Sequence, residues 1–171
     1  MLRFVGAILI MTAATIWGIG GAVRLKNRAR SLNALVSSLG VIKSEICDRF
    51  ATLPEIVTLL EKESIQPVTI FYTNVRKGLE KIGDSSFSSI WSKAVEETPE
   101  LLLRPQEALA LSELGFNLGR YNIAEQRGAV LYTLRRMESF AKQAELERDK
   151  DAKTRAFLGV AAGIFAVIIL I

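Results

Sequence analysis

The side chains in this chain that could do acid–base chemistry are closely spaced carboxylates. Glu61 with Glu63 and Glu96 with Glu97 are two such pairs, and paired carboxylates can divide the roles of general acid and general base. Both pairs fall where the sequence predicts helix ends, and no pattern around them predicts a cleft. We therefore interpret them as solvated surface groups rather than as a catalytic pair.

Other chemistry is scarce in the 171 residues. The chain has no histidine and a single cysteine, Cys47. Without histidine it lacks the commonest general base, the Ser-His and Cys-His arrangements and most transition-metal sites. It also lacks a Gly-rich loop that ends in Lys and Ser or Thr, so it should not bind ATP itself. One cysteine cannot form an internal disulfide, and we expect a buried structural thiol. We predict a protein that is not an enzyme, with no cofactor and no metal.

Two long apolar stretches without charge lie at the ends of the chain, at residues 4–23 and 156–171. A bilayer core of about 30 Å needs roughly 20 apolar residues in a helix. We therefore predict an N-terminal transmembrane helix over 1–24 and a C-terminal transmembrane helix over 156–171. Residues 25–144 would form a helical bundle, and the charged residues 145–155 a helical stalk. A mean hydropathy of +0.27 with 23% charged residues suits this division.

Cations flank both apolar stretches on their inner sides. They are Arg24, Lys26, Arg28 and Arg30 after the first, and Arg148, Lys150, Lys153 and Arg155 before the second. Such flanks stay in the cytoplasm, so we expect a multi-pass protein of the cell membrane whose central domain is cytoplasmic. The alternative is a cleaved signal peptide that ends near Gly20 and Ala22. Because the excess positive charge lies beside the membrane, we expect no binding of nucleic acid.

The pattern between these stretches is helical throughout, so we predict an all-α fold with a cytoplasmic bundle of about six helices. Thr52-Leu53-Pro54-Glu55 has the form of a capping box, and Pro67, Ser86 and Pro105 mark further helix starts. No proline follows Asn122, which predicts one long continuous last helix. Apolar residues recur at spacings of three and four in the first and last helices, and these seams should pair antiparallel. The seam residues are Leu32, Leu35, Leu39, Ile42 and Ile46, and Val130, Leu134, Met137, Ala141 and Ala144.

Small residues at a spacing of four lie within both predicted spans. They are Ala14, Gly18 and Ala22 in the first, and Gly159 and Gly163 in the second. This spacing lets helix backbones approach closely, so these residues are candidates for transmembrane packing. The alternative is the ordinary abundance of Gly and Ala in membrane helices. Neither span holds an ionisable side chain, so we expect no ion path through this chain alone.

Two segments carry a family resemblance. The first runs from Leu35 to Leu60 and contains Ser44-Glu45-Ile46 and Thr52-Leu53-Pro54; the second is Leu114-Gly115-Phe116-Asn117-Leu118-Gly119, followed by Gln126. Both resemble the stage III sporulation protein AB family. That family is related to the F-type inner-membrane platform proteins of type II secretion and type IV pilus machines. This chain departs from the pattern in having Thr52-Leu53-Pro54 where Thr-Pro-Leu is frequent, and Asn122 where Asp is frequent.

The resemblance implies a role in sporulation. It suggests a platform component of a secretion-like channel complex between mother cell and forespore, in the mother-cell membrane that surrounds the forespore. The implied partners are a cytoplasmic motor ATPase similar to stage III sporulation protein AA and other membrane proteins of the complex, in an oligomeric assembly. The alternative is a generic membrane-anchored adaptor or sensor with a cytoplasmic helical interaction domain.

A partner-binding surface is expected at two turns of the bundle. Its candidate residues are Phe50, Thr52, Pro54, Gly115, Gly119 and Asn122. The alternative for the two glycines is structural, since a glycine permits close helix packing and favours a helix C-cap. The sequence leaves both possibilities open.

Overall fold

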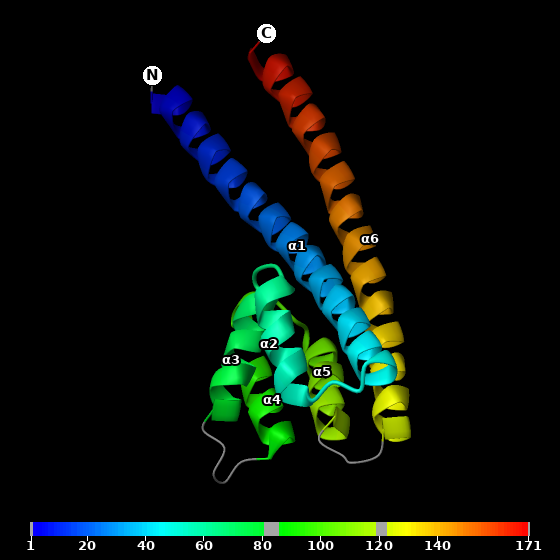
Figure 1. The fold of residues 1–171 in the computed structure, drawn as a ribbon. Helices are drawn as coiled ribbons and strands as arrows, with labels where there is room; N and C mark the ends of the chain where they lie inside the picture. Colours follow the sequence, from blue (N-terminus) through cyan, green and yellow to red (C-terminus); the bar gives the residue numbers. More distant parts are fainter. Residues whose placement is uncertain (1, 81–85, 119–122, 171) are drawn as a thin grey trace. The chain divides into compact units, whose positions relative to one another are not determined.

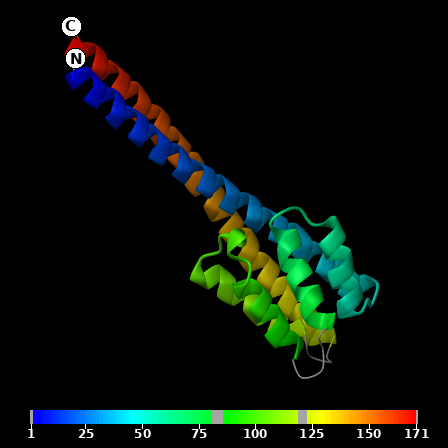
Figure 2. The same cartoon turned by 90° about the vertical axis from the view of Figure 1, so that its left-hand side faces the viewer.

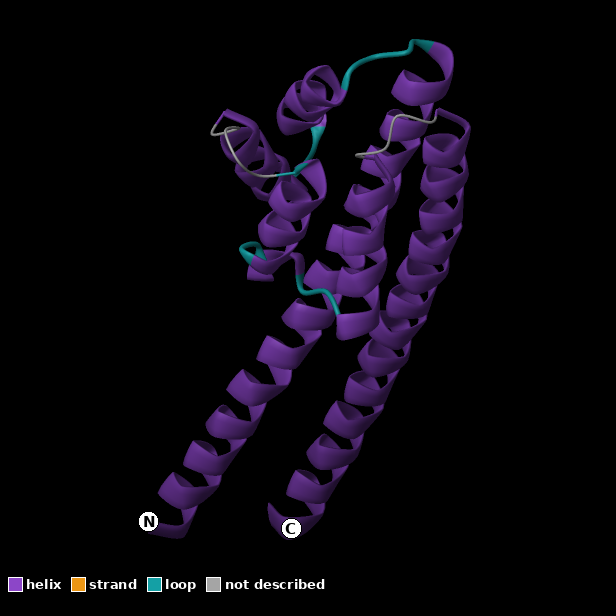
Figure 3. Cartoon of the chain, turned by 90° about the horizontal axis from the view of Figure 1, so that it is seen from below, coloured by secondary structure: helices purple, strands orange, loops and turns teal. Residues whose placement is uncertain are grey.

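Six α-helices and one short 3-10 helix make up the part of the chain that is described in this computed structural model (Figure 1). The described residues are 2–80, 86–118 and 123–170, with side chains for 21–80, 86–118, 123–151 and 154. The elements are α1 (Leu2–Asp48), α2 (Leu53–Glu63), α3 (Val68–Glu80), α4 (Phe87–Glu96), η1 (Pro99–Leu101), α5 (Pro105–Leu118) and α6 (Ile123–Leu170). These residues contain no strand (Figure 3), so the all-α prediction is confirmed.

The helices divide into two compact units. The first consists of Met1–Ala29 and Gln143–Ile171, and the second of Arg30–Lys142. In the first unit the guanidinium of Arg28 donates from Nη1 to Oε2 of Glu147 at 3.2 Å, which joins α1 to α6. Within the described part of the chain, no helix is long and apolar enough to cross a membrane. The candidate packing residues Ala14, Gly18, Gly159 and Gly163 lie outside the residues whose side chains are described.

The second unit contains α2 to α5 and the inner parts of α1 and α6 (Figure 2). The expected apolar seam of α1 is buried at all five positions: Leu32, Leu35, Leu39, Ile42 and Ile46. On α6 the seam residues Val130, Met137 and Ala141 are buried, and Leu134 is half-buried. Cys47 is half-buried, so the expectation of a buried thiol is wrong: it lies one residue past the last buried seam position of α1.

Aromatic rings form the centre of this core. Trp91 of α4 meets Phe71 of α3 edge-on at 4.9 Å between ring centroids, and Tyr72 lies 6.2 Å from the same indole. Such edge-to-face pairs add to the stability gained from burying the rings. The indole Nε1 also donates to the Leu111 carbonyl of α5 at 2.8 Å. One residue therefore holds α3, α4 and α5 together.

Buried hydroxyls tie neighbouring helices to each other. Tyr72 Oη donates to Ser38 Oγ at 2.8 Å, and Ser38 Oγ donates in turn to the Leu35 carbonyl at 2.8 Å. Thr98 Oγ1 donates to the Ala94 carbonyl at 2.7 Å and accepts from Asn74 Nδ2 at 3.1 Å. These pairs satisfy polar groups that would otherwise be costly to bury.

Local signals account for most helix starts. Thr52 donates through both its backbone N–H and its hydroxyl to Glu55 Oε2 at 2.8 Å, where the capping box was predicted. Ser86 Oγ accepts from the Ser89 N–H at 3.3 Å and begins α4. The connection between Pro99 and Pro105 was expected, but not the left-handed backbone of Leu102 within it, which has φ 55°.

Candidate functional site

The turn between α1 and α2 presents an aromatic side chain to solvent. Phe50 is 71% exposed and its backbone has φ 54°, in the left-handed region that non-glycine residues seldom adopt. The Ala51 N–H donates to the Glu45 carbonyl at 3.1 Å and closes the turn. A left-handed residue just after a helix is a common way for the helix to end, but that position is usually Gly or Asn, and here it places a large apolar ring in water.

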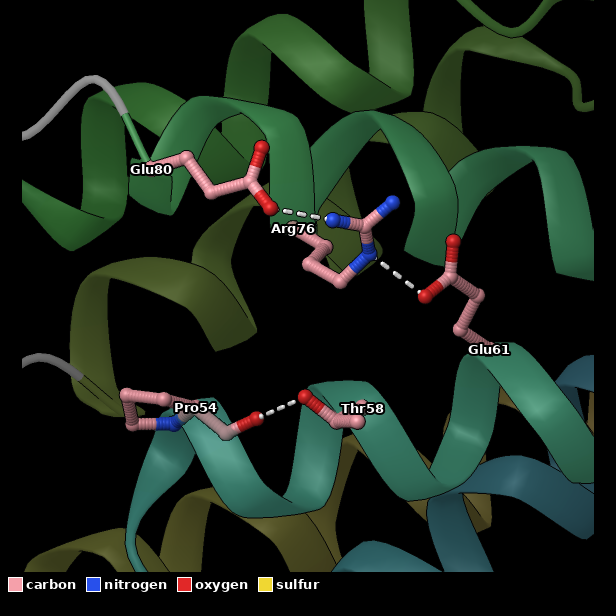
Figure 4. A network of polar contacts seen from close by, with 5 residues as sticks. All are labelled: Pro54, Thr58, Glu61, Arg76 and Glu80. Carbon is pink, nitrogen blue, oxygen red and sulfur yellow. Dashed lines mark hydrogen bonds and ion pairs between the residues drawn. The ribbon is translucent and has the colours of Figure 1, made fainter.

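Next to this turn lies a shallow groove of about 430 Å³ on the outer face of α2, lined by Pro54, Glu55, Thr58, Leu59 and Lys62. Thr58 Oγ1 donates to the Pro54 carbonyl at 2.8 Å (Figure 4), so its hydroxyl is engaged within the helix. The two hydrogen bonds from Thr52 lower the pKa of the Glu55 carboxyl, which therefore stays charged in mildly acidic solution. The groove thus combines apolar surface with a carboxylate, Glu55, and an ammonium group, Lys62.

The structure places Gly115 away from this turn, in the core. A Cβ at position 115 would lie 2.3 Å from Cδ1 of Trp91, so the close approach of α5 to α4 requires a glycine. Phe50, Thr52 and Pro54 lie together at the α1–α2 turn. Gly119 and Asn122 lie outside the described residues.

Glu61 and Glu97, one from each carboxylate pair, are engaged in ion pairs. Glu61 Oε2 accepts from Arg76 Nε at 2.6 Å, and Arg76 also pairs with Glu80 on its own helix (Figure 4). The hydrogen bond from Arg76 lowers the pKa of Glu61, opposite to what a general acid needs. Glu97 lies 3.7 Å from Lys93 Nζ on an exposed surface. Among the described residues no group of three or more Cys, Asp or Glu side chains could hold a metal ion.

A second surface, on the outer faces of α5 and α6, was not predicted from the sequence. Leu109, Phe116 and Tyr132 are each more than half exposed there. Arg136 of α6 forms an ion pair with Glu113 of α5 in the middle of this surface. The sequence does contain a signal for this surface. Residues 105–118 carry apolar side chains on two faces of the helix, and burial of one face is sufficient to form the core.

Comparison with known proteins identifies the family. The family model described as stage III sporulation protein AB matches residues 3–171. The chain belongs to this family. Stage III sporulation protein AB of Bacillus subtilis (strain 168) is 26% identical over 171 residues, which cover 99% of each chain. A solved structure of stage III sporulation protein AB matches 72% of this chain and 98% of its own, with a TM-score of 0.65 and 22% identity, and so supports the fold.

Membership of the stage III sporulation protein AB family makes this chain a sporulation protein with a helical bundle. The polar groups described above form ion pairs and helix caps. Of the predicted surface residues that the structure describes, those at the α1–α2 turn are exposed and Gly115 is buried.

Proposed function

We propose that this protein is a non-enzymatic platform component of a secretion-like channel complex between mother cell and forespore. It couples a cytoplasmic motor ATPase, similar to stage III sporulation protein AA, to membrane components of the complex. The observation that carries this proposal is the family match over residues 3–171, which takes in both terminal apolar stretches together with the helical bundle. The lack of any histidine supports a role without catalysis.

In this proposal the terminal stretches 4–23 and 156–171 anchor the chain in the mother-cell membrane that surrounds the forespore. The cations beside both stretches keep the residues between them in the mother-cell cytoplasm. Single cysteines introduced at Ser31 and at the C-terminus in a Cys47→Ser background test this orientation. When the variants are expressed in non-sporulating cells, where the cell membrane faces the medium, an impermeant thiol reagent should label the C-terminal position only. Labelling at position 31 from outside would contradict the orientation.

The α1–α2 turn is the surface that we assign to the motor. Phe50 supplies an exposed ring, and the groove beside Pro54 supplies apolar surface near the charged Glu55. Exposed aromatic residues next to a pocket are typical of the few positions that dominate binding energy at interfaces. A generic adaptor or sensor remains the second candidate, and the partners it captures distinguish the two.

Copurification from sporulating cells tests the proposal. The full chain should bring down the motor ATPase and sister membrane proteins of the channel complex. Phe50→Asn removes the ring while keeping a residue that tolerates a left-handed backbone, and it should reduce recovery of the ATPase by about tenfold, as loss of one binding anchor does. Ile65→Asn, at another exposed apolar position, is the matched control and should leave recovery of the ATPase unchanged. If the wild-type chain recovers neither the ATPase nor the sister proteins, the result favours the generic adaptor or sensor.

A further inference from the structure

The outer faces of α5 and α6 hold large apolar side chains in solvent. Leu109 and Phe116 on α5 are 57% and 56% exposed, and Tyr132 on α6 is 61% exposed. Leu109 and Phe116 are seven residues apart and so lie on the same side of α5. The same helix buries Ala110, Leu111, Leu114 and Leu118 on its other side. The core therefore does not account for the outer apolar residues.

An arginine lies at the centre of this surface and is held in place. Arg136 Nη1 donates to Glu113 Oε2 at 3.0 Å, and the side chains are 29% and 51% exposed. The guanidinium carbon lies 5.5 Å from the ring centroid of Tyr132 and 5.9 Å from that of Phe140. These cation–π contacts order the arginine before any partner arrives, which lowers the entropic cost of binding.

Two hydrogen bonds fix the register between α5 and α6. Gln126 Nε2 donates to the Leu118 carbonyl at 2.9 Å, and Arg136 pairs with Glu113, so the two helices run antiparallel. In this register Phe116 lies level with Tyr132, and Leu109 lies level with Phe140. We call this surface the α5–α6 patch; its residues are Leu109, Glu113, Phe116, Tyr132, Arg136 and Phe140. It has an apolar pair at each end and a pair of opposite charges in the middle.

We propose that the α5–α6 patch is where two copies of this chain associate, related by a two-fold axis parallel to α6. A rotation about this axis lays α5 of one copy over α6 of the other. Each Glu113 then faces Arg136 of the second copy, and the apolar pairs at each end meet apolar pairs. A two-fold axis across the helices would instead place Glu113 on Glu113, which like-charge repulsion disfavours.

The charge pattern selects a second copy over other occupants. The patch carries one anion and one cation side by side, so it is complementary to itself, as the interface of a two-fold dimer must be. A partner helix whose charges are all of one sign would leave one of these two groups facing a like charge. The axis also places both copies of Lys142, where the chain leaves this unit, at the same end of the dimer. Two copies anchored in one membrane need their Lys142 residues at the same end of the dimer. Only this argument from the membrane rests on the function proposed above.

Charge reversal and mixing test the proposal on the full chain in detergent micelles. The E113R and R136E variants each place like charges across the two-fold axis, and each should self-associate about a hundredfold more weakly than wild type by sedimentation velocity. An equal mixture of the two variants should recover the dimer, because the two cations of the first variant then face the two anions of the second. E96R reverses an exposed charge outside the patch and should dimerise like wild type.

A fourth variant, Tyr132→Ser, removes apolar surface without changing charge, and it should also weaken the dimer. Circular dichroism should show unchanged helix content for all four variants, since the substituted side chains lie on the surface. Any one of three results would overturn the proposal. The wild-type chain could be monomeric at tens of micromolar, the E113R and R136E variants could each dimerise normally, or their mixture could stay monomeric. None of these readouts involves the ATPase, so failure here leaves the proposed function untouched.

Discussion

The indole ring of Trp91 occupies the space that a side chain at position 115 would need. A Cβ there would lie 2.3 Å from Cδ1 and 2.4 Å from Cγ of the ring. The ring cannot easily move, because its Nε1 donates to the Leu111 carbonyl and it packs against Phe71 and Phe87. The separation of α4 and α5 therefore depends on this one glycine.

Gly115→Ala should destabilise the fold by about 1–3 kcal/mol, because overpacking a filled core outweighs the better helix propensity of alanine. Gly40→Ala in α1 is the matched control, since nothing lies within 4 Å of the added Cβ. That control should be neutral or stabilising by up to about 1 kcal/mol. Urea unfolding followed by circular dichroism measures both variants. Equal stability of the two variants would show that the Trp91 contact relaxes without cost.

The buried hydroxyl pair of Ser38 and Tyr72 should respond asymmetrically to mutation. Tyr72→Phe leaves Ser38 Oγ bonded to the Leu35 carbonyl and should cost about 1 kcal/mol. Ser38→Ala leaves the Tyr72 hydroxyl buried without its acceptor and should cost about 1–3 kcal/mol. The double variant should cost less than the sum of the two, which a double-mutant cycle of unfolding free energies measures. Strict additivity would mean that the hydroxyls are not coupled.

Tyr72 should also make stability fall in alkaline solution. Burial raises the pKa of Tyr72 above its ordinary value, because the phenolate would lose hydration. The unfolded chain releases this proton near pH 10, whereas the folded chain keeps it. Since only the unfolded state gains from releasing the proton, stability is unaffected below about pH 10 and falls as pH rises above it. The urea midpoint of wild type should decrease more between about pH 8 and pH 11 than that of Tyr72→Phe. Parallel decreases would contradict this assignment.

The sequence was informative about helices because their signals are local. Three predicted helix starts lie within a residue or two of those in the structure; they are marked by Thr52 with Glu55, by Pro67 and by Ser86. The seam from Leu32 to Ile46 predicted which face of α1 is buried, since periodicity reports burial directly. Leu102 was missed because its left-handed backbone depends on the turn around η1, and its residue type does not signal that conformation.

The α1–α2 turn of the candidate site is local in sequence, but the core contact of Gly115 and the α5–α6 patch were harder to predict because they depend on pairings between distant residues. Nothing in the residues around Gly115 indicates that Trp91 lies against it, 24 positions earlier. The pairing of Arg136 with Glu113 depends likewise on the register of two helices. Leu109 and Phe116 are apolar like their buried neighbours, so only the fold distinguishes surface from core on α5.

The aromatic centre around Trp91 draws its rings from a short stretch of sequence, residues 71–91. Closing such a short loop costs little chain entropy. During synthesis, this nucleus can therefore assemble while α6 is still inside the ribosome, before the last helix is available to complete the bundle.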